Sequence, residues 1–283
     1  MDLSVRNALT IDVEDYFQVE NFKDLIPFSQ WNTHALRVEA NALKLLEIFA
    51  EHKVKTTFFI LGWVAERVPH LVKEIHRQGH EIASHGYAHQ MITEQDPRQF
   101  REDVHKAKSI LESLTGEKVV GYRAPTFSIT RKTFWALDEL SEEGFLYDSS
   151  IFPVRHDRYG IPDWTQYMQK VPLHNGTEIV EMPPLTMRIL RWNVPMGGGY
   201  LRLAPLSVSC RAISRFNTLG HPAVIYLHPW EIDPEQPRFP LPPLKKFRHY
   251  VNLAQTENKL RSLLSFASFT RMKDILKKQH LIR

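Results

Sequence analysis

Residues 8–15 read ALTIDVED, an aliphatic and β-branched run that ends in three acidic residues within four positions. Such a run is typical of a strand buried inside a protein. Buried carboxylates cost several kcal/mol unless a hydrogen bond, an ion pair or a bound cation compensates them. Asp12, Glu14 and Asp15 therefore need a positive partner, which other parts of the chain have to supply.

Strand-like and helix-like segments alternate along the rest of the chain. Strands are expected at residues 8–13, 55–60, 80–84, 118–123, 145–148, 178–182 and 222–227, and helices at 35–52, 65–78, 97–114, 131–143 and 206–219. Seven strands in alternation with helices predict an α/β fold with a parallel sheet, closed into a distorted barrel rather than left open.

With 283 residues, the chain is long enough for one large α/β domain. We expect residues 1–235 to form the barrel and residues 236–283 to form a basic helical extension, joined by the Pro-rich segment PRFPLPPLKK (237–246). The extension carries eleven Lys/Arg and two acidic residues, whereas the remainder has a net charge of −5. This charge suits a membrane surface, a phosphate-bearing substrate or another polyanion, and equally a solvated helical surface. No nucleic-acid-binding motif is present.

The N-terminal residues contain no apolar run of signal-peptide length, and no segment reaches the roughly eighteen apolar residues of a membrane span. Cys210 is the only cysteine, so an internal disulfide is impossible and a reducing compartment fits. These features together predict a cytoplasmic protein.

Ionisable residues follow most of the expected strands. His85 and His89 follow the third strand, Arg123 ends the fourth, Asp148 ends the fifth and His228 follows the seventh. In parallel barrels the catalytic residues lie at the carboxyl ends of the strands. A purely structural protein has no need for this pattern, which therefore predicts an active site.

The spacing of His85 and His89 places both imidazoles on one side of a helical turn. Such a pair occurs by chance on solvated turns, but two imidazoles and one carboxylate are a common set of ligands for a divalent metal. One of the carboxylates after the first strand would bind the metal, and another would accept a proton from water. His228 would then act as general acid, and Arg123 would orient the basic carboxylate. Alone, His228 and Arg123 would be read as structural residues; together they favour catalysis.

The segments TIDVED, SHGYAH, YRAPTF, YDSS and YLH resemble, in the same order, the five motifs of the NodB-homology polysaccharide deacetylases, a family of carbohydrate esterases. The resemblance covers residues 9–228. Outside these motifs, GIPDW, PMGGGYLRL, HPWEIDPEQPR and FRHYVNL are similar to the deacetylases associated with bacterial exosortase and exopolysaccharide loci. The resemblance implies a distorted seven-stranded (β/α) barrel that removes N-acetyl groups from amino sugars of a polysaccharide. The expected cytoplasmic placement and the basic C-terminal region further suggest a lipid-linked or nascent glycan at the inner membrane face as the substrate.

The resemblance also implies individual roles. Those roles are Asp12 as general base, His85 and His89 as metal ligands, His228 as general acid, Arg123 as the tether of Asp12, and Asp148 as the residue that orients His228. The family's first motif has two adjacent aspartates, and Val13 replaces the second one here. Because side chains alternate along a strand, Glu14 shares a face with Asp12 and is the favoured ligand, with Asp15 as the alternative. Zinc is the first candidate for the metal.

Two other functions remain open from the sequence. Metal-independent relatives hydrolyse cyclic ureides such as allantoin on similar barrels, and a non-catalytic homologue would only bind polysaccharide. The His85/His89 pair favours a metal, and the presence of Asp12, Arg123 and His228 favours catalysis. Trp164, Trp192 and Trp230 suit either stacking on sugar rings or packing in the core.

Overall fold

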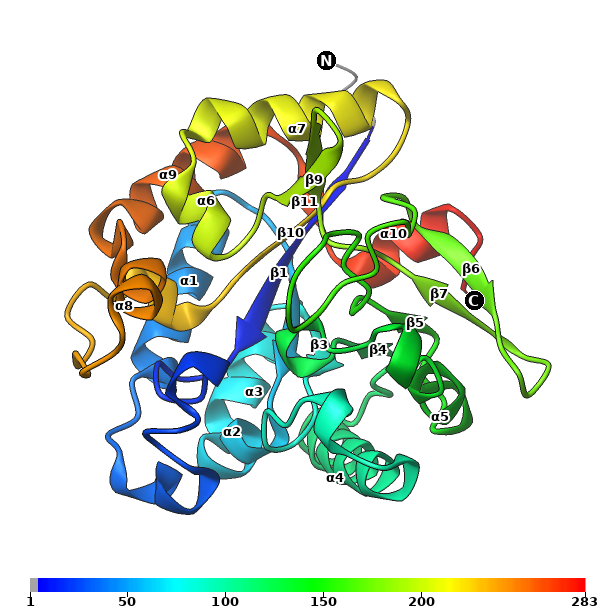
Figure 1. Cartoon of the computed structure of the whole chain (residues 1–283), viewed down its shortest axis with the longest axis horizontal. Coiled ribbons are helices and arrows are strands. Elements are labelled where there is room, and N and C mark those ends of the chain that lie inside the picture. The colour runs from blue at the N-terminus through cyan, green and yellow to red at the C-terminus, as the bar shows by residue number, and fades with distance from the viewer. Residues whose placement is uncertain (1–4, 283) are drawn as a thin grey trace.

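In the computed structural model, which describes residues 5–282, seven parallel strands form a curled sheet (Figure 1). Their order across the sheet is β10-β1-β2-β3-β4-β5-β7. These strands are β1 (Asn7–Val13), β2 (Thr57–Ile60), β3 (Glu81–Ser84), β4 (Gly121–Tyr122), β5 (Tyr147–Asp148), β7 (Glu178–Glu181) and β10 (Val224–Leu227). Each corresponds to one of the seven strands expected from the sequence, so the prediction of an α/β fold with a parallel sheet is confirmed.

The sheet curls like a barrel but does not close with a continuous ladder. Antiparallel β6 (Gln169–Pro172) occupies the outer edge of β7. The gap between β7 and β10 is bridged after β7 ends, where the Leu185 backbone N–H donates to the Val224 carbonyl at 2.7 Å. The barrel is therefore distorted, as expected.

Helices surround the curled sheet (Figure 1). They are α1 (Val38–Glu51), α2 (Gly62–Arg67), α3 (Pro69–Arg77), α4 (Pro97–Thr115), α5 (Ala136–Glu142), α6 (Gly199–Leu203) and α7 (Leu206–Thr218). The single helix expected over residues 65–78 was wrong, because the chain breaks at Val68 (φ −130°, ψ 58°). A proline disfavours the helical conformation in the residue before it, and Pro69 therefore starts a new helix.

Shorter elements complete the loops. The remaining strands before the C-terminal region are β8 (Thr186–Ile189) and β9 (Trp192–Pro195), which pair as a separate hairpin. The 3-10 turns are η1 (Glu20–Phe22), η2 (Phe28–Thr33), η3 (Ile92–Glu94), η4 (Pro125–Phe127), η5 (Arg131–Thr133) and η6 (Pro229–Ile232). Near the hairpin, Gly197 and Gly198 pack so closely on Tyr226 that a Cβ at either position would lie 2.4 and 2.8 Å from its ring.

The C-terminal region returns to the centre of the sheet. It contains α8 (Pro243–Tyr250), α9 (Leu253–Phe266), β11 (Phe269–Thr270) and α10 (Met272–Lys278). β11 pairs in parallel with Asn7 and Ala8 at the start of β1, and buried side chains of α10 share a cluster with Ala8 and Phe59. Up to residue 282, the C-terminal region therefore consists of three helices and a strand that the sequence did not predict, and this strand pairs with β1.

Every residue of β1 is buried. On one side β10 pairs with residues 8–11, and on the other β11 pairs with residues 7–8 and β2 with residues 10–13. Its carboxyl end delivers Asp12 and then Glu14 to the edge of the sheet where β3, β4 and β10 also end. Of the helices in residues 5–282, none combines the length and apolar composition needed to cross a membrane.

Candidate metal and catalytic site

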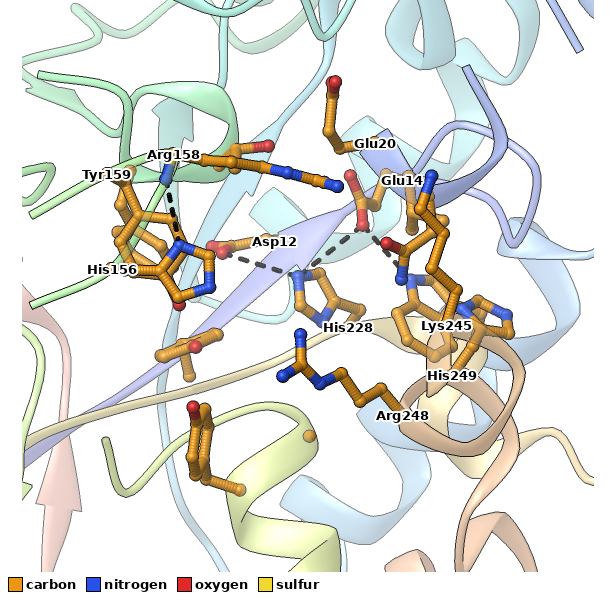
Figure 2. Close-up of a pocket in the computed structure, with 18 of the residues that line it drawn as sticks. Asp12, Glu14, Glu20, His156, Arg158, Tyr159, His228, Lys245, Arg248 and His249 are labelled. Atoms are coloured by element: carbon orange, nitrogen blue, oxygen red, sulfur yellow. Dashed lines mark hydrogen bonds and ion pairs between the residues drawn. The ribbon is translucent and has the colours of Figure 1, made fainter. Parts of the chain in front are cut away.

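A cavity of about 450 Å³ lies at the carboxyl edge of the sheet (Figure 2). Its volume falls within the range of small-molecule sites, about 300–1,000 Å³. Its wall includes five of the residues expected from the sequence to act in catalysis or metal binding: Asp12, Glu14, His85, His89 and His228. The structure therefore brings residues from β1, the loop after β3 and the end of β10 to one place.

Glu14, His85 and His89 form a buried group whose ligand atoms all lie within 4.8 Å of one another. The Oε2 atom of Glu14 is 2.7 Å from Nε2 of His89 and has no other partner among the described residues. A carboxylate oxygen and an imidazole nitrogen at this distance need a proton or a cation between them. Two imidazoles and one carboxylate also match the ligand set of catalytic zinc sites, so the residues fit a divalent metal.

Electrostatics favour an ionised Glu14. Burial opposes the charge, but the neighbouring His89 and His228 outweigh it and lower the pKa of Glu14 to about 2. Burial lowers the pKa of His85 to about 4. At neutral pH the group therefore offers one carboxylate and an uncharged His85 imidazole, the forms in which these side chains bind metals.

The loop after β3 holds both histidines in place. His85 directs Nδ1 at the Arg123 carbonyl, 2.7 Å away, which leaves its Nε2 for the cavity. Gly86 and His89 both have positive φ, 73° and 51°, so the chain turns sharply between them. Asp103 of α4 accepts a hydrogen bond from the Tyr87 backbone N–H at 2.9 Å and fixes the turn. A positive φ at a histidine is uncommon and is consistent with a functional constraint at His89.

Asp15 points away from this group. Its Oδ2 accepts hydrogen bonds from the backbone N–H groups of Arg37 and Val38, at 2.7 and 2.9 Å, and its Oδ1 accepts one from Tyr16 at 2.8 Å. Asp15 thus caps the beginning of α1, and burial raises its pKa to about 6. The alternative that Asp15 is the metal ligand is not supported, because both of its carboxylate oxygens are occupied by these backbone N–H groups and it does not belong to the Glu14–His85–His89 group.

Arg123 holds Asp12 as expected. Its Nη1 donates to Oδ1 of Asp12 at 2.6 Å and to Thr10 at 2.7 Å, and its Nη2 donates to the Ser149 hydroxyl at 2.9 Å. The guanidinium is fully buried, so these oxygens replace its hydration. The second oxygen of Asp12 is left facing the cavity.

His228 lies between Asp12 and Glu14 (Figure 2). Its Nε2 is 3.9 Å from Oδ2 of Asp12 and 3.5 Å from Oε1 of Glu14, and its Nδ1 is 2.7 Å from Oε1 of Glu231. Burial disfavours a charged ring, but Glu14 and Glu231 outweigh burial and raise the pKa of His228 to about 9. His228 is therefore protonated at neutral pH and carries a proton at the cavity.

The expectation that Asp148 orients His228 was wrong. Asp148 accepts hydrogen bonds from the hydroxyl and the backbone N–H of Ser150, at 2.5 and 3.0 Å, and lies beside Glu181. Burial raises the pKa of both carboxyl groups of this pair. Glu231 takes the orienting position instead, because the η6 turn returns the residue three positions after His228 to its ring.

Glu231 is itself held by Arg202, whose Nε lies 2.6 Å from its Oε2. The same guanidinium donates to three backbone carbonyls at the end of α8, those of Arg248, His249 and Val251. Burial opposes the charge of Glu231, but Arg202 and His228 lower its pKa to about 2. The C-terminal region thus supports the orientation of His228 through a buried ion pair that sequence reasoning missed.

Trp230 is a packing residue and not an open sugar platform. Its ring stacks between His228 and His249, with centroid distances of 5.2 and 4.4 Å, and its Nε1 donates to Oε1 of Glu14 at 3.1 Å. Among the described residues, neither Trp164 nor Trp192 lines the cavity: Trp164 packs near Phe134, and Trp192 is exposed on β9.

Comparison with known families gives two matches. Residues 31–143 match the model of the polysaccharide deacetylase family, and residues 149–277 match a domain of unknown function (DUF3473). The chain contains a polysaccharide deacetylase domain. His85, His89 and Arg123 belong to the deacetylase match, whereas His228 and Glu231 belong to the second one, so both matches contribute to one site.

Curated relatives of this polysaccharide deacetylase domain carry related names. A peptidoglycan deacetylase-like protein of Gibberella zeae is 42% identical over 97 residues, which cover 34% of this chain and 28% of that protein. A peptidoglycan-N-acetylglucosamine deacetylase of Bacillus cereus is 34% identical over 97 residues, 34% of this chain and 35% of that protein. The chain therefore spans about a third of the length of these relatives.

Solved structures show the same fold as this deacetylase domain. The structure of a putative polysaccharide deacetylase from Mycobacterium smegmatis matches with a TM-score of 0.62 and 21% identity, over 98% of this chain and 91% of that chain. An allantoinase matches with a TM-score of 0.61 and 17% identity, over 97% of this chain and 90% of that chain. Because the two scores are so close, the fold does not separate deacetylation from hydrolysis of a cyclic amide, and the site has to decide.

Proposed function

We propose that this protein is a metal-dependent hydrolase that removes N-acetyl groups from amino sugars of a bacterial exopolysaccharide or its lipid-linked precursor. The observation that carries the proposal is the convergence of Glu14, His85 and His89 beside an Arg123-held Asp12 and a Glu231-held His228. The names of the relatives support the N-acetyl sugar as the class of substrate. A lipid-linked precursor would place the reaction at the cytoplasmic face of the membrane.

Glu14, His85 and His89 would hold the metal, with zinc as the first candidate. When bound, the metal supplies Lewis acidity to the acetamide carbonyl and to the attacking water. His85 is pre-oriented for this role by its hydrogen bond to the Arg123 carbonyl, and Glu14 by its hydrogen bond from Trp230.

Asp12 and His228 divide the proton transfers. Oδ2 of Asp12 accepts the proton of the attacking water, while Arg123 holds the carboxylate in place through Oδ1. His228 donates its Nε2 proton to the sugar nitrogen as the C–N bond breaks, which yields acetate and a free amine. The Nε2 atom faces the cavity because Glu231 occupies Nδ1.

Replacement of Asp12 tests the assignment of the base. We expect Asp12→Asn to lower kcat by about 100-fold or more, because the proton acceptor is lost. Zinc content should remain near that of the wild-type protein, since Asp12 does not belong to the Glu14–His85–His89 group. Acetate release from N-acetylglucosamine oligosaccharides measures the first effect and atomic absorption the second. Asp24→Asn is the matched control, because Asp24 is 88% exposed.

Full activity of Asp12→Asn would reject this base. Activity that survives complete removal of metal by a chelator would reject the metal dependence.

Hydrolysis of a cyclic ureide and non-catalytic binding are the competing functions. The similarity in fold to an allantoinase is compatible with hydrolysis of a cyclic ureide. The buried Glu14–His85–His89 group argues against a metal-independent reaction of this kind. Assay of allantoin beside an N-acetylated glycan separates the two reactions. Binding of the glycan without release of acetate, in zinc-loaded protein, would favour the non-catalytic homologue.

A further inference from the structure

Besides Arg202, which is paired with Glu231, three cationic side chains outside the proposed catalytic group line the cavity. Arg158 comes from the loop after β5, and Lys245 and Arg248 come from α8. Figure 2 shows their charged ends pointing toward the space around His228 and Glu14. None of them has a part in the proposed proton transfers or metal binding.

This positive charge is only partly neutralised by the protein. Among residues 5–282, no carboxylate lies within 4.0 Å of the guanidinium of Arg158 or Arg248. Lys245 has one contact, at 3.9 Å, with the 88% exposed Asp24. Of the other acidic residues on the outer wall, Asp157 lies 2.9 Å from His156, and Glu20 interacts with Arg158 only at longer range. The cavity mouth therefore retains positive charge that a ligand can neutralise.

Arg158 and Arg248 both lie near the part of the cavity wall formed by His156 and Tyr159. His156 and Tyr159 form a ring stack there, with centroids 3.9 Å apart. Burial lowers the pKa of His156. The guanidiniums of Arg158 and Arg248 also lower this pKa, whereas the Asp157 carboxylate raises it. Both guanidiniums are thus within electrostatic reach of one imidazole, although they come from segments about ninety residues apart in sequence.

The backbone that carries Arg248 is fixed in place. Buried Arg202 donates to the carbonyls of Arg248, His249 and Val251 at 3.1, 2.8 and 2.7 Å. Its Nε is committed to Glu231, the partner of His228. The end of α8 that carries Arg248 is therefore held in a fixed position relative to His228, which lowers the entropic cost of binding a ligand there.

Apolar side chains stand beside the cations. Leu244 and Phe247 are 60% and 55% exposed, lie on α8 with Lys245 and Arg248, and line the same cavity. A neutral N-acetylated sugar chain offers neither a charge for the guanidiniums nor an apolar segment for these side chains. A phosphate that joins a sugar to an apolar chain offers both.

We propose that α8 and the loop at residues 156–159 bind a phosphate of the substrate, so that the amino sugar is presented as a glycosyl phosphodiester or pyrophosphate. Guanidinium groups bind phosphate oxygens through paired, charge-assisted hydrogen bonds, and Lys245 adds a point charge. This inference rests on the proposed function and narrows its substrate from polysaccharide in general to a phosphate-linked saccharide.

The test compares two saccharides that differ only in one phosphate. An N-acetylglucosamine tetrasaccharide and the same molecule with a phosphate ester at its reducing end are given to the zinc-loaded full chain, and kcat/KM for acetate release is measured. We expect the phosphorylated substrate to be preferred at least tenfold, and the preference to shrink in high salt. In an Arg158→Gln/Arg248→Gln double variant the ratio should fall to about one. Lys246→Gln is the matched control, because Lys246 is exposed on α8 and is not part of the cavity wall.

Equal kcat/KM for both saccharides in the wild-type protein would overturn the inference and leave the proposed deacetylation intact. If neither saccharide is cleaved, the proposed deacetylation of such sugars fails, and calorimetric binding to the metal-free full chain then decides on the phosphate site. There, tenfold tighter binding of the phosphorylated saccharide supports it and equal binding rejects it. Retention on phosphatidylglycerol vesicles that the double variant loses, without any preference between the saccharides, would assign the cations to lipid headgroups and also overturn the inference.

Discussion

At the scale of single residues, each of the three carboxylates at the carboxyl end of β1 has a different partner. Asp12 is held by the guanidinium of Arg123, Glu14 lies with His85 and His89, and Asp15 caps the backbone N–H groups at the start of α1. Three neighbouring carboxylates are compatible with burial because each one faces a separate donor or cation. One short segment therefore contributes to the proposed catalysis, to the proposed metal binding and to the attachment of a helix.

Substitutions at positions 14 and 15 should have opposite effects on metal binding and stability. We expect Glu14→Gln to lose bound zinc, because an amide is a poor replacement for the carboxylate ligand. Asp15→Asn should keep zinc at the wild-type stoichiometry but lower the free energy of unfolding by about 1–2 kcal/mol, because it weakens the cap of α1. Metal analysis and urea unfolding measure the two effects. A loss of zinc in Asp15→Asn with retention in Glu14→Gln would reverse the assignment.

Glu231 and Asp148 can be compared in the same way. Glu231→Gln should lower kcat by about 10- to 100-fold, since a neutral amide no longer favours the protonated, oriented His228 ring. Asp148→Asn should change kcat far less, because Asp148 contacts Ser150 and Glu181 rather than His228. Steady-state acetate release at saturating substrate measures both. A larger loss in Asp148→Asn than in Glu231→Gln would restore the role expected from the sequence.

These two positions also show what the sequence can and cannot predict about the site. The side chains at strand ends could be found because parallel strands deliver their carboxyl ends to one edge. The partner of His228 could not be chosen from the order of residues, since it depends on whether the loop after β10 turns back. The Pro-Trp-Glu spacing after His228, with Glu231 three positions on and Pro229 at the first turn, was a signal that a 3-10 turn could form there.

At the scale of elements, length and burial decide which strands could be predicted. The seven parallel strands lie in apolar runs because most of their residues are buried. The strands β6, β8 and β9 were missed because each exposes part of its length, and β11 because its two residues do not lie in a continuous apolar run. β11 pairs with Asn7 and Ala8 of β1, whose edge is free there because the pairing of β1 with β2 begins only at Thr10.

The segment between β2 and β3 contains a histidine that should make the fold sensitive to acid. His80 is 2% exposed, packs against Phe49 and Phe58, and accepts a hydrogen bond from the Thr56 backbone N–H at 3.1 Å. Burial lowers its pKa from 6.5 to about 3. The unfolded chain therefore binds this proton more readily, so stability is complete above pH 6.5 and declines as the pH falls toward the folded value. The loss from this residue between pH 7.5 and 5 is about 2 kcal/mol.

Replacement of His80 by Asn tests this contribution. An Asn side chain offers an acceptor near the position of Nδ1 but cannot be protonated in this range. We expect the variant to be less stable at pH 7.5, because the ring is lost, and to lose about 2 kcal/mol less than the wild-type protein between pH 7.5 and 5. Urea unfolding at both pH values measures the difference. The exposed His70 provides the control, and equal acid sensitivity of His80→Asn and the wild-type protein would contradict the prediction.

At the scale of the whole molecule, a single sheet contains strands from both of the regions that match separate family models. The deacetylase match covers residues 31–143 and the second match residues 149–277. In the sheet, β1 lies between β2 of the first match and β10 of the second and pairs with both. The proposed base and metal ligands come from the first half of the chain, whereas His228, Glu231 and Arg202 come from the second. The second region completes the site because it supplies the proposed general acid and its support.

The barrel expected over residues 1–235 should not be stable without the residues that follow it. Removal of residues 236–283 takes away β11 from the edge of β1 and exposes the core surface beneath Met272, Ile275 and Leu276. Each of these side chains contributes about 1.5–3 kcal/mol through burial, so their loss alone approaches the whole stability of a typical domain, about 5–15 kcal/mol. It also removes the backbone carbonyls that satisfy buried Arg202. We expect a chain of residues 1–235 to show no cooperative thermal transition by circular dichroism.

Single substitutions in the full chain test the same packing. Leu276→Ala should lower the free energy of unfolding by about 2–5 kcal/mol, whereas Lys277→Ala, on the exposed face of α10, should leave it almost unchanged. A shortened chain that melts cooperatively within about 5 °C of the full protein, a shift of roughly 1–2 kcal/mol, would show that the extension only covers a complete barrel.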